Sequence, residues 1–168
     1  MAHMSSAKTF TEREIFEYLF EIAKSSRDPE GVVAASLVRD GVVLAVKPSS
    51  DDSQFHAEFL VLKEIADTGR VIQPEDILYT TLEPCSDMPK INDGGDCVTC
   101  ILEAGISRVI YAATDPEYST KAAERLRSSG VEYRQIKDPE IIRRAGELFN
   151  STINKDLSAM KLPRKSKI

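Results

Sequence analysis

Hydrophobic patterns typical of helices and of strands alternate along the chain, and this alternation limits the possible folds more than any other feature. Helical patterns repeat apolar residues every three to four positions, whereas the strand patterns are short runs rich in β-branched residues. The predicted order is helix, strand, strand, helix, followed by three further strand–helix pairs. Strands separated by helices form a sheet that helices cover on both faces. The sequence therefore predicts an α/β fold, a three-layer α/β/α sandwich with a mixed five-stranded central sheet.

Capping and turn residues predict where these elements begin and end. Thr11 and Glu14 have the spacing of a capping box, and Asp96 and Asp138 each precede a helical pattern. Arg39-Asp40-Gly41 lies between two apolar runs and predicts a hairpin turn. The expected strands are 32–38, 42–46, 77–82, 108–113 and 131–136, and the expected helices are one of about 15 residues after Thr11, then 56–69, 97–104, 119–128, and one from Pro139 past Phe149 and Ile153.

Length and composition indicate one globular domain. A chain of 168 residues, 42% of them hydrophobic, can form a single core. We expect residues 1–4 to be an expression-tag remnant, 5–155 to form the domain, and the basic residues 156–168 to be a flexible tail. No apolar run reaches the ~18 residues of a membrane-spanning helix. Three cysteines without a disulfide pattern are typical of a reducing compartment, so we expect a cytoplasmic protein.

His56, Cys85 and Cys97 are residue types that bind zinc, and each lies at the boundary of a predicted element. His56 begins a helix, Cys85 follows a strand, and Cys97 begins another helix. One imidazole and two thiolates form a soft donor set that favours Zn²⁺. Three protein ligands leave the fourth tetrahedral position for water, as in catalytic zinc sites. A lone histidine is more often structural, but the three residues together predict a Zn²⁺ site.

Cys97 and Cys100 also form a C-x-x-C pair, which is the pattern of a thioredoxin-like redox site. Such a pair normally follows a strand directly, whereas here the polar loop 86–96 precedes it. The start of a helix lowers the pKa of a thiol, and this favours Cys97 as the ligand. Cys100 lies one turn into the helix, where we expect a small core residue facing the sheet.

Glu58 lies two residues after His56, in the first turn of a predicted helix. An acidic residue there can simply be an exposed side chain that the helix dipole favours. Beside a metal and its water, the same carboxylate would act as a general acid/base that moves protons. For Glu83 two interpretations remain open, because it could orient a ligand of the metal or cap a backbone N–H.

Four segments together resemble the cytidine deaminase-like superfamily. They are His56-Ala57-Glu58, the run 81–86 (TLEPCS), Cys97 followed by 104–109 (AGISRV), and Asp115-Pro116. Within it, residues 10–153 are most similar to the pyrimidine deaminase domain of riboflavin biosynthesis. The resemblance implies a zinc-dependent hydrolytic deaminase with His56, Cys85 and Cys97 as ligands and Glu58 as the catalytic proton carrier. It also implies a homo-oligomer.

Several loops differ from the riboflavin enzymes. Those enzymes carry an asparagine in the turn before the first strand, where this chain has 28–31 (DPEG), and a Gly-x-x-His segment where it has 45–48 (AVKP). In the loop between the two cysteines, Lys90 alone is a counterpart of their basic residue. The candidate substrate-binding residues are therefore Ala57, Glu83 and Lys90.

The expected substrate is an amino-substituted pyrimidine-type heterocycle, such as a pyrimidine nucleotide like that of the riboflavin pathway. The first alternative is a nucleobase or nucleoside deaminase acting on tRNA, DNA, guanine or cytosine compounds. A net charge of −5 disfavours nucleic acid, because phosphate backbones are bound by basic surfaces. The second alternative is a non-catalytic, zinc-stabilised partner subunit, which would have no need of Glu58.

Overall fold

The computed structural model describes residues 7–88 and 91–153. The expected tag remnant and basic tail, and Lys90, lie outside these residues. Helices and strands follow one another in the predicted order. The elements are α1 (Glu12–Ala23), β1 (Ala34–Arg39), β2 (Val42–Pro48), α2 (Ala57–Thr68), β3 (Ile77–Leu82), α3 (Cys97–Ala104), β4 (Arg108–Ala113), α4 (Ala122–Ser128), β5 (Glu132–Gln135) and α5 (Pro139–Thr152).

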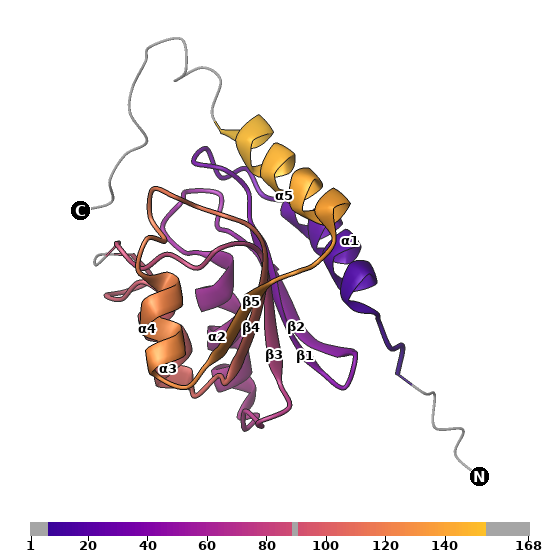
Figure 1. Ribbon diagram of the computed structural model, residues 1–168, viewed down its shortest axis with the longest axis vertical. Coiled ribbons are helices and arrows are strands. Elements are labelled where there is room, and N and C mark those ends of the chain that lie inside the picture. The colour runs from indigo at the N-terminus through magenta and orange to yellow at the C-terminus, as the bar shows by residue number, and fades with distance from the viewer. Residues whose placement is uncertain (1–6, 89–90, 154–168) are drawn as a thin grey trace.

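The five strands form one mixed sheet in the order β2-β1-β3-β4-β5. β1 pairs antiparallel with both β2 and β3, whereas β3, β4 and β5 run parallel. Helices α1 and α5 cover one face, and α2, α3 and α4 cover the other (Figure 1). The predicted three-layer α/β/α sandwich with a five-stranded mixed sheet is confirmed. No helix in the described part of the chain is long and apolar enough to cross a membrane.

One end of the sheet gathers segments from most of the chain, because of the strand directions. The parallel strands β3 and β4 both finish there, and Leu82 pairs with Ala113. β1 runs the other way and therefore begins at this end, opposite the last residue of β2, with Ala34 paired to Pro48. The loops before β1, after β2, after β3 and after β4 thus meet in one place, as loops do at the carboxyl ends of parallel strands.

The local signals that were predicted to start helices do so. Thr11 and Glu14 form the capping box of α1. The side chain of Asp96 accepts the N–H of Thr99, and that of Asp138 accepts the N–H groups of the first turn of α5. These caps are short-range hydrogen bonds, so the sequence alone is enough to locate them.

Several predicted boundaries were wrong, among them those of β1, expected at 32–38, and of β2, expected at 42–46. The first helix has 12 residues rather than about 15. α4 begins at Ala122 rather than at 119, because the side chain of Asp115 accepts the N–H groups of Glu117 and Tyr118 and holds the preceding segment in turns. α5 ends at Thr152, whose hydroxyl accepts the N–H of Val32 from the loop before β1, so the helix does not run past Ile153.

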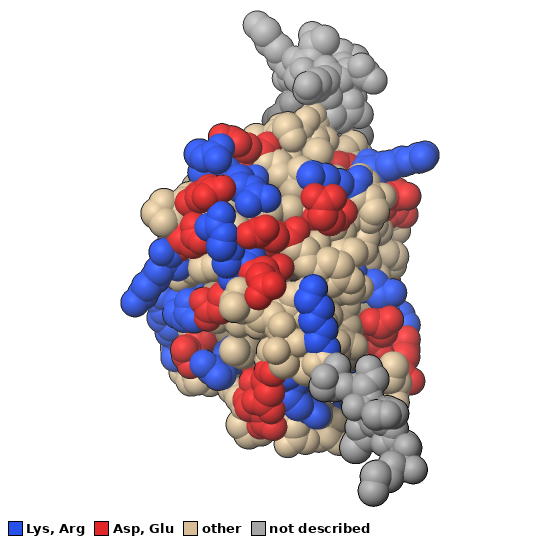
Figure 2. Space-filling model, turned by 90° about the vertical axis from the view of Figure 1, so that its right-hand side faces the viewer, with Lys and Arg blue, Asp and Glu red and all other residues tan. Residues whose placement is uncertain are grey.

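The face formed by α1 and α5 carries positive and negative side chains in alternation, and neither sign forms a continuous patch there (Figure 2). Ion pairs join the helices to each other and to the sheet: Arg13 of α1 contacts Asp138 and Glu140 at the start of α5, and Arg134 of β5 contacts Glu12. This face therefore lacks the single-sign field expected of a surface that binds nucleic acid.

At the opposite end of the sheet, Arg39 and Asp76 tie the end of β1 to the segment before β3. The guanidinium donates to both carboxylate oxygens, at 2.7 Å and 2.9 Å, and the N–H of Gln73 donates to Oδ2 at 2.8 Å. The Asp76 side chain is fully buried. Burial raises the pKa of Asp76, but the hydrogen bonds from Arg39 and Gln73 and the charge of Arg39 outweigh it, so the pKa lies below its ordinary value.

We expect Asp76→Asn to lower the free energy of unfolding at neutral pH by roughly 1–3 kcal/mol, because it weakens hydrogen bonds to a buried charged group. A carboxyl group whose pKa is lowered by folding stabilises the protein above its ordinary pKa of about 4, and loses that contribution as the pH falls through the folded-state value. Urea denaturation should therefore show a gap between wild type and variant at pH 7 that shrinks toward about pH 3. The exposed Asp67 of α2 offers a control, Asp67→Asn. A gap that stays constant with pH would contradict this account.

Candidate metal centre and active site

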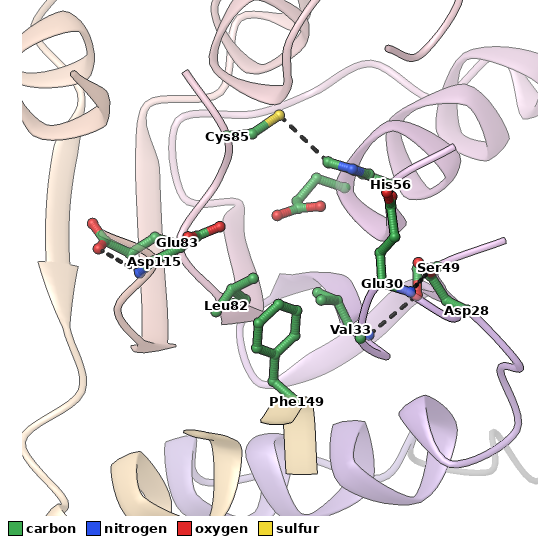
Figure 3. Close-up of a pocket in the computed structure, with 12 residues that line it drawn as sticks. Asp28, Glu30, Val33, Ser49, His56, Leu82, Glu83, Cys85, Asp115 and Phe149 are labelled. Carbon is green, nitrogen blue, oxygen red and sulfur yellow. Dashed lines mark hydrogen bonds between the residues drawn. The ribbon is translucent and has the colours of Figure 1, made fainter. Parts of the chain in front are cut away.

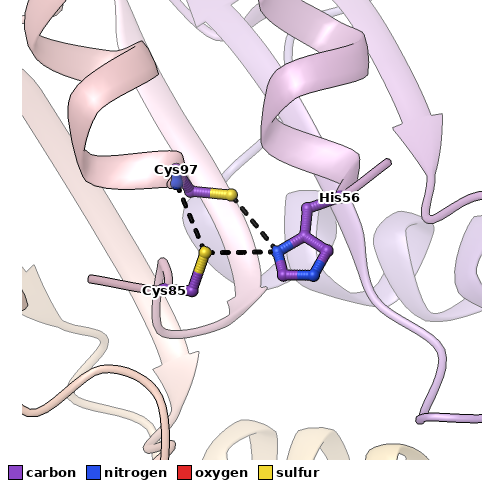
Figure 4. Close-up of side chains that lie close together, drawn as sticks. All are labelled: His56, Cys85 and Cys97. Carbon is purple, nitrogen blue, oxygen red and sulfur yellow. Dashed lines mark hydrogen bonds between the residues drawn. The ribbon is translucent and has the colours of Figure 1, made fainter. Parts of the chain in front are cut away.

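Three side chains from separate segments converge at the end of the sheet where the loops meet. Nδ1 of His56 lies 3.4 Å from Sγ of Cys85 and 3.4 Å from Sγ of Cys97 (Figure 4). The ligand atoms of the three residues all lie within 4.8 Å of one another. Both cysteines are buried, whereas His56 is partly exposed. The three predicted ligands are therefore the ones that the fold brings together.

The secondary structure explains how each of these side chains is positioned. His56 is the N-cap of α2, with extended backbone, so its ring reaches the cluster from the end of the helix. Cys97 is the first residue of α3. Cys85 comes three residues after β3 ends, and its carbonyl accepts the N–H of Val98 in the first turn of α3. Two helix N-termini and one strand end therefore face a common centre.

The arrangement fits a Zn²⁺ ion. With Zn–S near 2.3 Å and Zn–N near 2.0–2.1 Å, a tetrahedral site has S···N separations of roughly 3.6 Å. The two S···N distances observed between His56 and the cysteines are 3.4 Å. One neutral imidazole and two thiolates are a donor set that zinc favours over calcium or magnesium. His56, Cys85 and Cys97 can thus hold zinc with little rearrangement.

The two thiols differ in acidity. The sequence predicted a lowered pKa for Cys97, whereas in the structure the lowered pKa is that of Cys85. Hydrogen bonding with the side chain of Cys97, with His56 and with the backbone N–H of Cys97 lowers the pKa of Cys85. Burial raises the pKa of Cys97 well above its ordinary value. The expectation that the helix start would lower the pKa of Cys97 was wrong, because the first N–H of α3 points at the sulfur of Cys85 instead.

Cys100 lies outside the cluster. It is half-buried one turn into α3, and its sulfur lies 3.8 Å from the carbonyl oxygen of Gly95. Its side chain packs against the hydrophobic core, as expected of a structural residue. Cys97 and Cys100 are both free thiols.

Asn92 joins the histidine to one of the cysteines, and the sequence analysis missed it. Its side-chain oxygen accepts the N–H of His56 at 2.8 Å, and its Nδ2 donates to Sγ of Cys97 at 3.3 Å. The residue is buried and has a left-handed backbone with φ of 54°. Asn tolerates this conformation better than most residues. The Asn92-Asp93-Gly94-Gly95 run was a turn signal, but nothing local in it indicated contact with His56.

Glu58 is buried beside the cluster, with 2% of its surface exposed. Its Oε1 lies 3.1 Å from the hydroxyl of Thr80, and its Oε2 lies 3.6 Å from the sulfur of Cys97. Burial raises the pKa of Glu58, although the charge of His56 acts in the other direction. A raised pKa suits a carboxyl group that both takes up and releases a proton near neutral pH. The interpretation of Glu58 as an exposed helix residue is wrong.

Glu83 is held by two partners at the end of β3. Oε1 accepts the N–H of Asp115 at 3.1 Å, and Oε2 accepts the hydroxyl of Tyr133 at 2.6 Å. Glu83 therefore caps a backbone N–H, which is one of the two interpretations that the sequence left open. The carboxylate links the loop after β3 to the loop after β4 and to β5.

A hollow lies beside the cluster. Its volume is about 390 Å³, and this figure includes the solvent space at its open mouth. Cys85 and His56 lie on one side of it, and Leu82, Phe149 and Val33 lie opposite (Figure 3). The buried Ala57 is not among the residues that line it, whereas Glu83 is. Lining residues that sequence reasoning did not assign are Asp28, Glu30, Ser49, Asp115 and Phe149.

We expect the purified protein to carry one zinc ion per chain, measured by elemental analysis. Cys85→Ser and Cys97→Ser should each lose most of the metal, because a hydroxyl is a poor replacement for a thiolate ligand. Cys100→Ser is the matched control and should retain it. Loss of zinc from the Cys100 variant, with retention in the other two, would refute the assignment.

We expect Asn92→Ala to weaken zinc binding about 10- to 100-fold, although it removes no ligand, because residues that orient metal ligands contribute on this scale. Competition with a chromogenic chelator measures the affinity. Asp93→Ala, at the neighbouring exposed residue that also has a positive φ, is the control for loop strain. Equal losses in both variants would show that loop conformation, rather than the contacts of Asn92, sets the affinity.

Comparison with known proteins gives one consistent family. The model of the cytidine and deoxycytidylate deaminase zinc-binding region matches residues 10–113. The riboflavin biosynthesis protein RibD of Aquifex aeolicus is 30% identical over 111 residues, covering 65% of this chain and 29% of that protein. RibD of Synechocystis sp. is 27% identical over 123 residues, covering 72% and 32%. The chain thus spans about a third of the length of the curated relatives it matches.

Solved structures show the same fold. A diaminohydroxyphosphoribosylaminopyrimidine deaminase/5-amino-6-(5-phosphoribosylamino)uracil reductase from Thermotoga maritima superposes with a TM-score of 0.70 at 23% identity, over 89% of this chain and 43% of that one. The Rib2 deaminase of Aspergillus oryzae, in complex with DARIPP, superposes with a TM-score of 0.67 at 19% identity, over 89% and 95%. On the family match over residues 10–113, the chain belongs to the cytidine and deoxycytidylate deaminase family, which is defined by its zinc-binding region.

Proposed function

We propose that the protein is a zinc-dependent hydrolytic deaminase of an amino-substituted pyrimidine-type heterocycle. The observation that carries this proposal is the placement of Glu58, a buried carboxyl group beside the His56–Cys85–Cys97 cluster and on the wall of the hollow. A zinc site that only stabilised the fold would not need an acid of raised pKa next to it. The non-catalytic partner subunit is therefore the weaker interpretation.

The roles of the residues follow from their positions. When bound, zinc supplies a nucleophile from water at neutral pH, because it lowers the pKa of that water to about 7. Glu58 takes one proton from the water and passes it to the ring nitrogen. It then carries a second proton, released when the newly attached hydroxyl becomes a carbonyl, to the amine, and the C–N bond breaks to release ammonia. Thr80 orients the carboxyl group through Oε1. The apolar side chains of Leu82 and Phe149 face the flat heterocycle and exclude water from it.

The names of the relatives suggest the first compound to try. The Thermotoga maritima protein is described as acting on a phosphoribosylated diaminohydroxypyrimidine, so a pyrimidine nucleotide of the riboflavin pathway is a finer form of the proposal. A tRNA adenosine deaminase and a dCMP deaminase share the fold, so adenosine in tRNA and deoxycytidylate belong in the same panel. Release of ammonia from each compound identifies the substrate. We also propose that the chain forms a homo-oligomer and acts in the cytoplasm.

We expect Glu58→Gln to keep its zinc but to lose about 10²- to 10⁴-fold in the rate of ammonia release, because the amide cannot carry the proton. Elemental analysis and an ammonia assay on the same sample measure the two effects separately. Glu64→Gln on the same helix is the control, since Glu64 pairs with Lys47 on the surface and should not affect the rate. Undiminished ammonia release by the Glu58 variant would refute the proposed role.

A further inference from the structure

We propose that Arg125 of α4 is a positioning residue for the metal site. Its guanidinium joins the residue after Cys85 to the residue before Cys97, and in this way holds the two thiol ligands at the separation that zinc requires. The inference rests on the zinc site of the proposed function, but not on the identity of the substrate. Arg125 lies outside residues 10–113, the region that matches the family model.

The contacts of the guanidinium are the first observation. Nη1 donates to the carbonyl oxygen of Ser86 at 3.1 Å and to Oδ2 of Asp96 at 2.7 Å. Nη2 donates to the hydroxyl of Thr99 at 2.9 Å. Ser86 comes directly after Cys85, and Asp96 comes directly before Cys97. One side chain therefore bridges the two segments that carry the thiols, and we call this set of contacts the Arg125 bridge.

Asp96 connects the Arg125 bridge to the start of α3. Its Oδ1 accepts the N–H of Thr99 at 2.8 Å as the cap of the helix, and its Oδ2 accepts the guanidinium. The Asp96 side chain is only 10% exposed. Cys97 is the first residue of this helix, so its position depends on where the helix begins. By contacting both the cap and Thr99 in the first turn, Arg125 fixes the start of α3.

Ser86, at the other end of the bridge, is held on the same side of the molecule. Its N–H donates to the carbonyl oxygen of Tyr118 at 2.7 Å, and its hydroxyl accepts the N–H of Lys121, the residue before α4, at 2.9 Å. Helices α3 and α4 lie side by side on one face of the sheet (Figure 1). The start of α4 and Arg125 therefore hold the segment after Cys85 together.

Backbone hydrogen bonds also join Cys85 to α3. The N–H of Cys97 donates to its sulfur at 3.3 Å, and the N–H of Val98 donates to its carbonyl oxygen at 3.1 Å. The bond between Arg125 and Asp96 is shorter, at 2.7 Å, and joins two charged groups. Charge-assisted hydrogen bonds are roughly twice as strong as neutral ones. The Arg125 bridge is therefore a strong restraint on these two segments, in addition to the backbone bonds.

The alternative is an arginine that only stabilises the fold, and Arg127 of the same helix is an example. Its Nε and Nη2 donate to the carbonyl oxygen of Tyr133, and its guanidinium carbon lies 5.5 Å from the centre of the Tyr133 ring. These contacts join α4 to β5. Arg125 differs because its partners adjoin two metal ligands. Arg127 is thus a matched control for the loss of an arginine from α4.

The consequence for the metal is geometric. Zinc bonds each thiolate near 2.3 Å, so the two sulfurs must stay close to each other for both bonds to form. If the two segments can move apart, part of the binding free energy is used to bring the sulfurs together, and the affinity falls. Groups that orient metal ligands contribute about 10- to 100-fold. Arg125 acts through one intervening residue on each side, so we expect about tenfold, the lower end of that range.

The first test measures zinc affinity by competition with a chromogenic chelator, using the full chain in every case. Arg125→Gln should bind zinc about tenfold more weakly than wild type. Arg125→Lys should be nearly as weak, because an ammonium group lacks the planar fork that reaches several acceptors at once. Arg127→Gln should match wild type. Urea denaturation of the zinc-free proteins shows how far each variant is destabilised in general.

The second test is spectroscopic and separates positioning from stability. Cobalt(II) in place of zinc has visible absorption bands that depend on the geometry of its ligands. With cobalt in excess, so that every site is filled, we expect the bands of Arg125→Gln to be shifted or broadened. The bands of Arg127→Gln should coincide with those of wild type. A variant that is only less stable would keep the wild-type bands.

Several results would overturn the inference. Wild-type affinity and bands in Arg125→Gln would do so, as would an equal loss of affinity in Arg127→Gln. Full affinity in Arg125→Lys would show that positive charge alone is sufficient. If the Arg125 variants do not fold, Asp96→Asn decides, because Asn keeps Oδ1 as the cap of α3 but removes the charge that holds the guanidinium. A several-fold loss of affinity there supports the inference, and wild-type affinity overturns it.

The outcomes also distinguish this inference from the proposed function. Zinc that binds more weakly to the Arg125 variants, in a protein that releases ammonia from no compound, would support the inference and contradict the deaminase. Ammonia release by wild type, with wild-type zinc affinity in Arg125→Gln, would support the deaminase and overturn the inference. A wild-type protein that binds no zinc would overturn both.

Discussion

The site depends on the meeting of two helix N-termini and the end of a strand at one point. Strand direction brings this about, because β3 and β4 run parallel and finish at the end of the sheet where β1 begins. His56 caps α2, Cys97 begins α3, and Cys85 follows β3, so each donor comes from a rigid element or directly beside one. The first N–H of α3 donates to the sulfur of Cys85 at that point.

Hydrogen bonds support the cluster of His56, Cys85 and Cys97, and they give its two thiols different pKa values. Asn92 ties His56 to Cys97, and the first N–H of α3 supports the sulfur of Cys85. The start of α3 therefore does not lower the pKa of Cys97, the thiol at that position. Glu58 is buried beside the cluster, and burial is the largest influence on its pKa. Distances and burial, rather than residue type, distinguish Glu83, which holds the loops together, from Glu58, the proposed proton carrier.

The residues that line the hollow come from several parts of the chain. The cluster and Glu58 belong to the region that matches the family model. Asp28 and Glu30, in the loop before β1, belong to the same region, whereas Phe149 of α5, which packs against that loop, lies outside it. Loops and a terminal helix can change without disturbing the metal, which is how one fold serves several substrates.

Sequence reasoning predicted the order of the elements, the caps at Thr11, Asp96 and Asp138, and the three candidate ligands that the fold brings together. These features are local or have a characteristic spacing, so each can be recognised in a short segment. The contact of Asn92 with His56 spans 36 residues, and that of Val32 with Thr152 spans 120. Such contacts depend on how the loops pack once the sheet has formed. The sequence alone determined which atoms could hold zinc; the tertiary structure decided which thiol is the more acidic, how deeply Glu58 is buried and which carboxylates line the hollow, because burial and distance exist only after folding.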